Sequence, residues 1–240
     1  WNIPQTVTVT GVDDIIVDGS ITYTVTNDVN TTLTTDPNYD PLGADDVSVT
    51  NQDNDAATIA INSVTQLETH SGTTSFVFTA THSGEEVPGG YSVTWYTSTA
   101  GTTAKTPSDF ASASGTLVFT GSVGETKTVT ITVNGDLMVE RDETFKVILG
   151  SVIGASGKDV SIPTAGKTGT GTILNDDNAT LSINDVAVSE GNSGTKTLTF
   201  TVTLSHAVED GLTVDYATAN NTALAGEDYV SKSGTLSFPG

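Results

Sequence analysis

The sequence predicts an all-β protein that is built of tandem antiparallel β-sandwiches. Three observations support this prediction: apolar residues alternate with polar ones along short runs, Gly, Asn and Asp separate the runs, and the whole pattern repeats along the chain. Apolar residues make up 35% of the 240 residues, below the ~45 to 50% that is usual for globular domains. Thr, Ser, Gly, Asn and Asp fill the difference, which is typical of β-structure and not of a disordered chain.

The repeat has a period of 122 residues, the separation between Thr58–Ile61 and Thr180–Ile183. Later in the unit the separation falls to 119 residues, so that Ser114–Leu117 matches Ser233–Leu236. A repeat of this length indicates one folding unit per period. We therefore expect the second half of a unit at residues 1–55, a complete unit at 56–177, and the first half of another unit at 178–240.

Within the complete unit the apolar residues alternate with a period of two, as in half-buried strands. The strands are expected at residues 57–64, 74–82, 91–98, 115–120, 126–134, 143–151 and 168–174. About seven such runs between turn residues suit an antiparallel sandwich. No run has the pattern of a helix, and Trp95 is expected in the core.

Each half-unit is expected to bare a hydrophobic face and sheet edges, which are unstable in isolation. Either the natural chain runs on at both ends, or residues 178–240 of one copy close against residues 1–55 of the next. The second arrangement is a heterologous contact, which can build filaments. The chain starts at Trp1 with neither Met nor a signal peptide, so we expect it to be a segment of a longer protein.

The net charge of the chain is −21, with 29 acidic residues against 8 basic ones. This charge repels phosphate backbones and anionic lipid headgroups, which argues against nucleic-acid and membrane-surface binding. It attracts hard divalent cations, above all Ca²⁺. The absence of Cys excludes disulfides, thiolate metal sites and a Cys nucleophile, and no apolar run approaches the ~20 residues that cross a bilayer.

Acidic residues recur at the same places in each unit, in segments between predicted strands. They are Glu68, Asp136, Glu140, Glu143, Asp176 and Asp177 in the complete unit, Asp13, Asp14, Asp18, Asp53 and Asp55 in the first half-unit, and Glu190 in the last. Loops of a sandwich gather at its ends, so these groups could meet at one pole. Like charges at close range disfavour ionisation, and Ca²⁺, which takes six to eight oxygens at about 2.3 to 2.6 Å, would remove that cost.

At these residues the chain resembles the Calx-beta family, the calcium-binding sandwich module of sodium-calcium exchangers and many bacterial surface proteins. The resembling strings are Ser189-Glu190-Gly191, Tyr216 with Gly226-Glu227-Asp228-Tyr229, Ser233-Gly234-Thr235-Leu236, the Asp-rich segment 135–145, and Asn175-Asp176-Asp177. Together they cover nearly all of residues 56–240. The resemblance implies an immunoglobulin-like sandwich that binds Ca²⁺ and has no catalytic activity.

By that resemblance, the recurring acids of the complete unit hold Ca²⁺ together with the carbonyl of Met138, and those of the first half-unit do so with the carbonyl of Ile16. Glu190 is expected to share its ion with acids of the following copy or the following sequence. The chain departs from well-charged family members at Ala100, Asn220, Gly135 and Ile21. These departures suggest fewer ions or weaker binding, nearer the ~10⁻⁴ to 10⁻³ M of extracellular modules.

Other readings need no metal. Asp and Asn favour turns because their side chains bond to nearby backbone N–H groups, and acidic surfaces aid solubility. Asp109 and Asp228, each before an aromatic residue, are expected to cap turns. His70, His82 and His206 do not keep their place between units and are expected to be solvated loop residues. Gly169 and Gly171 lie in a predicted strand with no helix after it, which argues against a phosphate loop.

The sequence therefore predicts a non-catalytic, calcium-stiffened spacer, adhesin stalk or filament subunit of an extracellular or cell-surface protein, and a bacterial source is expected. The alternative is an adhesion module that binds a ligand or carbohydrate, with Ca²⁺ only structural. That alternative needs an exposed aromatic cluster, and aromatic residues are only 6% of the chain. The sequence contains no Gly-x-Ser-x-Gly, His-Glu-x-x-His or P-loop motif of an enzyme.

Overall fold

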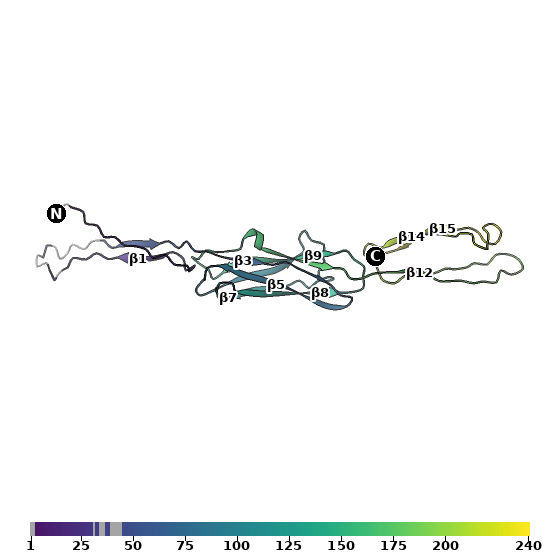
Figure 1. The fold of residues 1–240 in the computed structure, drawn as a ribbon, viewed down its shortest axis with the longest axis horizontal. Coiled ribbons are helices and arrows are strands. Elements are labelled where there is room, and N and C mark those ends of the chain that lie inside the picture. The colour runs from purple at the N-terminus through teal and green to yellow at the C-terminus, as the bar shows by residue number, and fades with distance from the viewer. Residues whose placement is uncertain (1–2, 31, 34–36, 39–44) are drawn as a thin grey trace.

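The computed structural model describes residues 3–30, 32–33, 37–38 and 45–240. The molecule is elongated, with a two-sheet sandwich in the middle and strand pairs extending from each end (Figure 1). The described residues before 56 extend from one end of the sandwich, and residues after 177 extend from the other. The predicted all-β class is confirmed, because the helical content of the described residues is a single 3₁₀ turn, Thr164–Gly166.

Nine strands form the two sheets of the sandwich. The first sheet has the order β10 (Val160–Ser161), β3 (Ala57–Ile61), β5 (Gly72–Gly84), β8 (Thr126–Gly135). The second has the order β4 (Val64–Leu67), β11 (Thr168–Leu174), β9 (Glu143–Ile153), β6 (Tyr91–Ser98), β7 (Ser114–Phe119). Neighbouring strands are antiparallel except for β10 with β3 and β11 with β4.

One predicted strand is in fact two. The run expected at residues 57–64 divides into β3 and the start of β4, which belong to different sheets. Asn62 holds the crossing, because its side-chain oxygen accepts a hydrogen bond from the Thr79 N–H at 2.6 Å and its own N–H donates to the Thr79 carbonyl at 3.1 Å. The periodicity continues across this point, so it does not reveal the change of sheet.

Aromatic side chains from several strands fill the core around Phe145 in β9. The ring of Phe145 stacks on Phe110 with centroids 4.5 Å apart and meets Phe76 and Phe78 at 5.8 and 5.9 Å. A β-carbon at Gly171 would lie 2.4 Å from this ring, so the neighbouring strand β11 must carry glycine there. Trp95 packs partly buried against the same core.

His82 is buried, so the expectation of a solvated loop histidine is wrong for this residue. It lies in β5 at the inward-facing positions shared by Phe78 and Ala80. Its Nδ1 lies 2.6 Å from the hydroxyl of Tyr91 and its Nε2 lies 2.9 Å from the carbonyl of Glu85. Because both ring nitrogens have partners, the histidine can stand in the core between the two sheets.

Outside the sandwich, the residues that the structure describes form three isolated strand pairs. They are β1 (Ile21–Val25) with β2 (Val47–Asn51), β12 (Leu181–Ile183) with β13 (Val202–Leu204), and β14 (Leu212–Ala217) with β15 (Ser233–Phe238). In repeat phase they correspond to β9 with β11, β3 with β5, and β6 with β7, and they keep the same register. Tyr23 faces Val49, for example, as Phe145 faces Gly171.

The apolar faces of these end segments are uncovered. Residues 3–14 match β8 and residues 195–201 match most of β5, yet neither segment forms a strand. Val7 is 78% exposed where its counterpart Val129 is 2% exposed, and Phe200 is 52% exposed where Phe78 is fully buried. Among the described residues, the end segments therefore lack the second layer that closes the core of the complete unit.

Replacing Phe145 with alanine should lower the free energy of unfolding by about 3 to 5 kcal/mol, because the substitution leaves a cavity beside Phe76, Phe78 and Phe110. Urea denaturation followed by circular dichroism would measure the change. Val118→Ala, at an exposed position on β7, is the matched control and should change stability by less than about 0.5 kcal/mol. Equal effects of the two substitutions would contradict this description of the core.

Candidate metal centres

Strand direction brings the predicted acidic residues of the complete unit to one end of the sandwich. The parallel strands β4 and β11 end side by side, and the N–H of Glu68, just after β4, donates to the carbonyl of Leu174 at 3.2 Å. Asp176 and Asp177 follow Leu174 directly. The segment between β8 and β9, which carries Asp136 and Glu140, lies at the same end and leads into β9 at Glu143.

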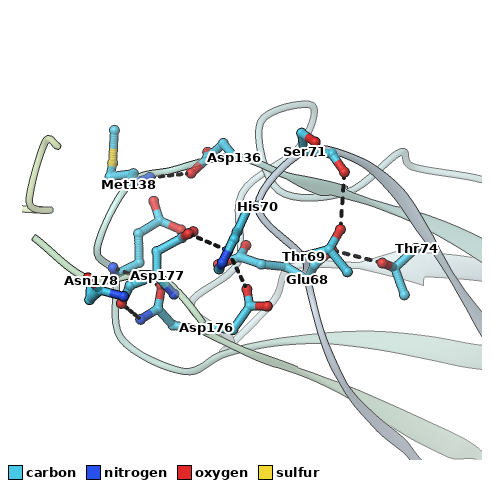
Figure 2. Close-up of polar contacts among 12 residues, drawn as sticks. Glu68, Thr69, His70, Ser71, Thr74, Asp136, Met138, Asp176, Asp177 and Asn178 are labelled. Carbon is cyan, nitrogen blue, oxygen red and sulfur yellow. Dashed lines mark hydrogen bonds and ion pairs between the residues drawn. The ribbon is translucent and has the colours of Figure 1, made fainter.

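A first cluster forms where Glu68 meets the segment after β11 (Figure 2). The Nδ1 of His70 lies 2.7 Å from Oδ1 of Asp177 and 3.6 Å from Oδ1 of Asp176. Glu68 and Asp177 are both buried. Burial, together with the charges of Glu140 and Asp136, raises the pKa of Glu68 to about 7.

Two oxygens of this cluster are buried without a hydrogen-bond partner in the structure, Oδ1 of Asp176 and Oδ2 of Asp177. A buried carboxylate oxygen that accepts nothing is costly. A cation among these oxygens would remove the cost by serving as their common partner. The buried, unsatisfied oxygens of the first cluster thus fit a metal ion better than they fit a set of solvated charges.

A second cluster consists of Asp109, Glu140 and Glu143, each with a carboxylate oxygen within 4.8 Å of the others. Burial and a hydrogen bond with Asp109 raise the pKa of Glu143 to about 8, whereas burial and the charge of Asp109 raise that of Glu140 to about 6. Burial alone would raise the pKa of Asp109, but hydrogen bonds from Glu143 and the Lys105 backbone outweigh it and hold this pKa below its usual value. These opposite shifts favour a proton on Glu143, in its hydrogen bond to Asp109, over a proton on Asp109.

Asp109 belongs to this cluster although the sequence analysis assigned it only to a turn. The turn assignment is confirmed, since Oδ2 of Asp109 accepts the Lys105 N–H at 2.5 Å and Oδ2 of Asp228 accepts the Leu224 N–H at 2.9 Å. Recurrence in the sequence also marks Asp109. Asp228 stands 119 residues after it, the separation seen elsewhere in this part of the repeat.

Asp136 and Met138 form the turn between the two clusters. The N–H of Met138 donates to Oδ1 of Asp136 at 2.7 Å (Figure 2). Asp136 itself is exposed, but its charge contributes to the raised pKa of both Glu68 and Glu140. The six predicted acids of the complete unit thus gather at one end, with Asp136 at the rim, and the assignment of individual ligands remains a prediction.

The acids of the first half-unit line a single pocket. Its lining includes Asp13, Asp14, Asp18, Asp53 and Asp55. Oδ1 of Asp14 accepts the Ile16 N–H at 3.0 Å, the counterpart of the turn at Asp136, and the Ile16 carbonyl accepts the Asp18 N–H at 2.9 Å. Burial and the neighbouring charges of Asp53 and Asp13 raise the pKa of Asp55.

Glu190 is not part of any of these groups. It is exposed in residues 178–240, beyond the complete unit. Its counterpart Glu68 meets the acids of its own unit because β4 pairs with β11. Among the described residues, Glu190 has no such strand beside it, so the predicted ion at this residue would need acids from outside residues 178–240.

The two acidic loops also contact the unit that follows each of them. The N–H of Val17 donates to the carbonyl of Glu86 at 2.9 Å, and Val17 is fully buried in the core cluster of the complete unit. At the next junction the N–H of Val139 donates to the carbonyl of Ala207, and the N–H of Glu209 donates to the carbonyl of Val139, both at 2.9 Å. The same loop thus carries acids and contacts the next unit at both junctions.

The model of one protein family, described as the Calx-beta domain, matches this chain at residues 52–185 and again at residues 175–240. Solved structures with a similar fold include an apo-form Calx CBD1 domain, with 23% sequence identity and a TM-score of 0.43 over 51% of this chain and 99% of that one. A structure of CBD12 from CALX1.2 has 24% identity and a TM-score of 0.42 over 76% of this chain and 71% of that one.

A third structure, described as the calcium binding domain CBD12 of CALX1.1, has 21% identity and a TM-score of 0.40 over 76% of this chain and 70% of that one. The search of curated proteins found no match to this chain.

Without a divalent cation, the complete unit should lose stability as the pH rises from about 4.5 to 8. The pKa values of Glu68, Glu140 and Glu143 are raised in the folded state to about 7, 6 and 8, so the folded chain binds more protons than the unfolded chain over this range. The lowered pKa of Asp109 acts in the opposite sense, at lower pH. Thermal melts in chelator at several pH values would measure the trend.

The same melts with excess Ca²⁺ should show a stabilisation that grows across this pH range, because the cation competes with the protons. An apo melting temperature that rises steadily from pH 5 to 8 would contradict the crowded state of these carboxyls.

Proposed function

Because this chain belongs to the Calx-beta family, of which calcium binding is the characteristic feature, we propose that it is a non-catalytic, calcium-stiffened spacer of an extracellular or cell-surface protein, such as a filament, stalk or adhesin. The observation that carries the proposal is the buried Asp177, whose Oδ2 has no hydrogen-bond partner and which lies at the exit of the complete unit toward the next.

The proposed ion acts on the joint between units. Asp177 immediately precedes Asn178, the first residue of the following half-unit, and the loop that carries Glu140 also bonds to the following unit through Val139. Bound Ca²⁺ would supply a positive charge that holds these segments together. In its absence the like charges repel, and the joint loosens.

Glu209 of the following half-unit adds to this coupling. Its charge contributes to the raised pKa of Glu140 and Glu143, and its Oε1 lies 3.5 Å from the Nζ of Lys105 in the complete unit. A cation at the second cluster would therefore weaken the repulsion between two successive units as well as the repulsion within one of them.

The extracellular location rests on the number of ligands that the chain offers. Ala100, Asn220 and Gly135 stand where well-charged family members carry acids, which favours weak sites of about 10⁻⁴ to 10⁻³ M, the range of extracellular modules. In the part of the chain that the structure describes, no helix has the length and hydropathy needed to cross a membrane.

No specific observation favours the alternative of a carbohydrate-binding module. The pocket in the first half-unit is lined by Asp, Asn, Gln, Gly, Val and Ile. A sugar platform at this pocket would need an aromatic ring in the lining, which these residues do not provide.

Replacing Asp177 with asparagine should abolish most of the stabilisation of the complete unit by Ca²⁺. A ligand at 100 times its Kd stabilises the folded state by about 2.7 kcal/mol, which corresponds to roughly 10 °C in the Tm of a domain of this size. Calorimetric melts with Ca²⁺ and with chelator would measure the difference for each protein.

Asp159→Asn is the matched control for this test, because Asp159 is exposed and lies outside both clusters. The control should respond to Ca²⁺ as the unsubstituted chain does. If the unsubstituted chain melts at the same temperature with Ca²⁺ and with chelator, the proposed function is wrong.

Replacing Val17 with aspartate should loosen the first joint, because the new charge would have to be buried between two units. Small-angle scattering should show a shorter and more variable end-to-end dimension than in the unsubstituted chain. Thr10→Asp, at an exposed position in the same segment and outside the acidic pocket, should leave the scattering curve unchanged. A rod of unaltered length in the Val17 variant would mean that this contact does not set the orientation of the units.

A further inference from the structure

We infer that the first cluster of the complete unit also binds a borderline transition-metal ion of the Zn²⁺ class, through a site formed by His70, Asp176 and Asp177. This site, called the His70 site below, rests on its own donor atoms. Only the competition between its ion and Ca²⁺ rests on the proposed function.

The His70 site brings donor atoms together from two separate segments of the complete unit. His70 lies between β4 and β5, whereas Asp176 and Asp177 follow β11. One donor atom from each of the three side chains, an imidazole nitrogen and two carboxylate oxygens, lies within 4.8 Å of the others. The Nδ1 of His70 faces both carboxylates, at 2.7 Å from Oδ1 of Asp177 and 3.6 Å from Oδ1 of Asp176 (Figure 2).

These separations are close to those that a zinc ion requires. Zn²⁺ binds imidazole nitrogen and carboxylate oxygen at about 2.0 to 2.2 Å with tetrahedral geometry, so neighbouring donor atoms lie about 3.3 to 3.6 Å apart. The distance from Nδ1 to Asp176 is already 3.6 Å. The distance from Nδ1 to Asp177 is 2.7 Å and would have to lengthen by less than about 1 Å.

The imidazole nitrogen determines which class of ion fits this site. Ca²⁺ takes oxygen ligands, whereas imidazole is a good ligand for Zn, Cu, Fe and Ni. The second cluster, and the acidic pocket of the first half-unit, contain no histidine among the described residues. The repeat carries Asn192 at the position that matches His70. The histidine therefore distinguishes this site from the other acidic groups of the chain.

A simple ion pair between His70 and Asp177 explains less of the geometry. A protonated Nδ1 donates a single hydrogen, which can serve Oδ1 of Asp177. Oδ2 of Asp177 and Oδ1 of Asp176 still have no hydrogen-bond partner, although both atoms are buried and the side chain of Asp177 is only 2% exposed. A metal ion in place of the Nδ1 hydrogen can bind a carboxylate of each residue, which one hydrogen cannot do.

The conformation of the loop that carries His70 does not depend on the histidine. Thr69 has a left-handed backbone with φ of 81°, and its counterpart Gly191 has φ of 85°. Oγ1 of Thr74 donates to the carbonyl of Glu68 at 2.8 Å and holds the start of this loop (Figure 2). Asparagine, which the repeat carries at the matching position, should therefore replace the histidine without unfolding the loop.

Asp177 belongs both to the His70 site and to the acids that the proposed calcium binding uses. Ca²⁺ takes six to eight oxygens and so draws on several segments, whereas an ion at the His70 site needs one oxygen from each of two residues. Two divalent cations near one carboxylate repel each other. Each ion should therefore weaken the binding of the other, and the Zn²⁺-class ion should loosen the calcium contacts at the joint that follows Asp177.

Calorimetric titration of the purified, metal-free 240-residue chain with zinc chloride tests the site. His70→Asn should weaken the binding of Zn²⁺ by more than about tenfold, since loss of even an outer partner of a metal ligand costs that much. Ser71→Asn, at an exposed position beside the histidine, is the matched control and should bind Zn²⁺ as the unsubstituted chain does. Absence of Zn²⁺ binding, or equal binding by the two variants, would overturn the inference.

Nitrogen-15 spectra of the imidazole groups identify the coordinating atom. The chain has three histidines, and single asparagine variants assign the resonances of His70 and His206. Zn²⁺ should shift the Nδ1 resonance of His70 and leave those of His82, which is buried in the core, unchanged. A shift at His206 with none at His70 would place the ion elsewhere and overturn the inference.

Melting temperatures in Ca²⁺ and in Zn²⁺ separate this inference from the proposed function. His70→Asn should keep the stabilisation by Ca²⁺ and lose that by Zn²⁺, whereas Asp177→Asn should lose both. If Ca²⁺ stabilises no protein of the set while Zn²⁺ binds through His70, the proposed function is wrong and the His70 site stands.

Titration of Ca²⁺ at several fixed concentrations of Zn²⁺ tests the competition. The apparent affinity of the unsubstituted chain for Ca²⁺ should fall as the concentration of Zn²⁺ rises, and that of the His70→Asn variant should stay constant. An equal fall in both proteins, or no fall in either, would overturn the competition at Asp177.

Discussion

The strand pairs that cross between the two halves of a unit are the interaction on which the rest of this structure depends. They bring β5 against β8 and β4 against β11, and in doing so they close the two sheets over the ring of Phe145. The same pairs carry Glu68, from the first half, to Asp176 and Asp177, from the second. Closing the core and assembling the acidic end are thus one event. Among the described residues at the two ends of the chain the crossing pairs are missing, so the apolar faces stay exposed and Glu190 stays apart from the other acids.

Bringing these carboxylates together raises the repulsion between them, and contacts within the chain relieve only part of it. A hydrogen bond joins Glu143 and Asp109, and His70 contacts Asp177. These contacts still leave Oδ1 of Asp176 and Oδ2 of Asp177 buried without a hydrogen-bond partner. A divalent cation can neutralise several carboxylates at once, which a single proton cannot do. Since the acidic loops also bond to the next unit, any change in their charge reaches the joint.

The sequence predicted the strands well where inward and outward residues alternate, and less well where the backbone changes sheet. The division between β3 and β4 at Asn62 was missed because a hydrogen bond to Thr79, and no break in periodicity, marks it. His82 was assigned to solvent from its residue type, although its place in the alternation of Phe78 and Ala80 indicates an inward side chain. Its burial depends on two partners that the alternation does not predict. They are the hydroxyl of Tyr91, nine residues further along the chain, and the backbone carbonyl of Glu85.

The candidate site shows the same division. Recurrence in the sequence selected Glu68, Asp136, Asp177 and the acids that accompany them, because a repeated unit repeats its loop chemistry. Asp109 recurs as well, as Asp228, but recurrence does not distinguish a carboxylate that only caps a turn from one that also faces Glu143.

The sequence by itself determined the β-class, the period of the repeat, the alternation of each strand and the residues that carry charge, because these follow from local pattern and composition. Only the tertiary structure decided which strands pair across the unit, which carboxylates are buried together and which oxygens lack a partner. These properties depend on contacts between residues as far apart as Glu68 and Asp177, and no local pattern records the distance between them.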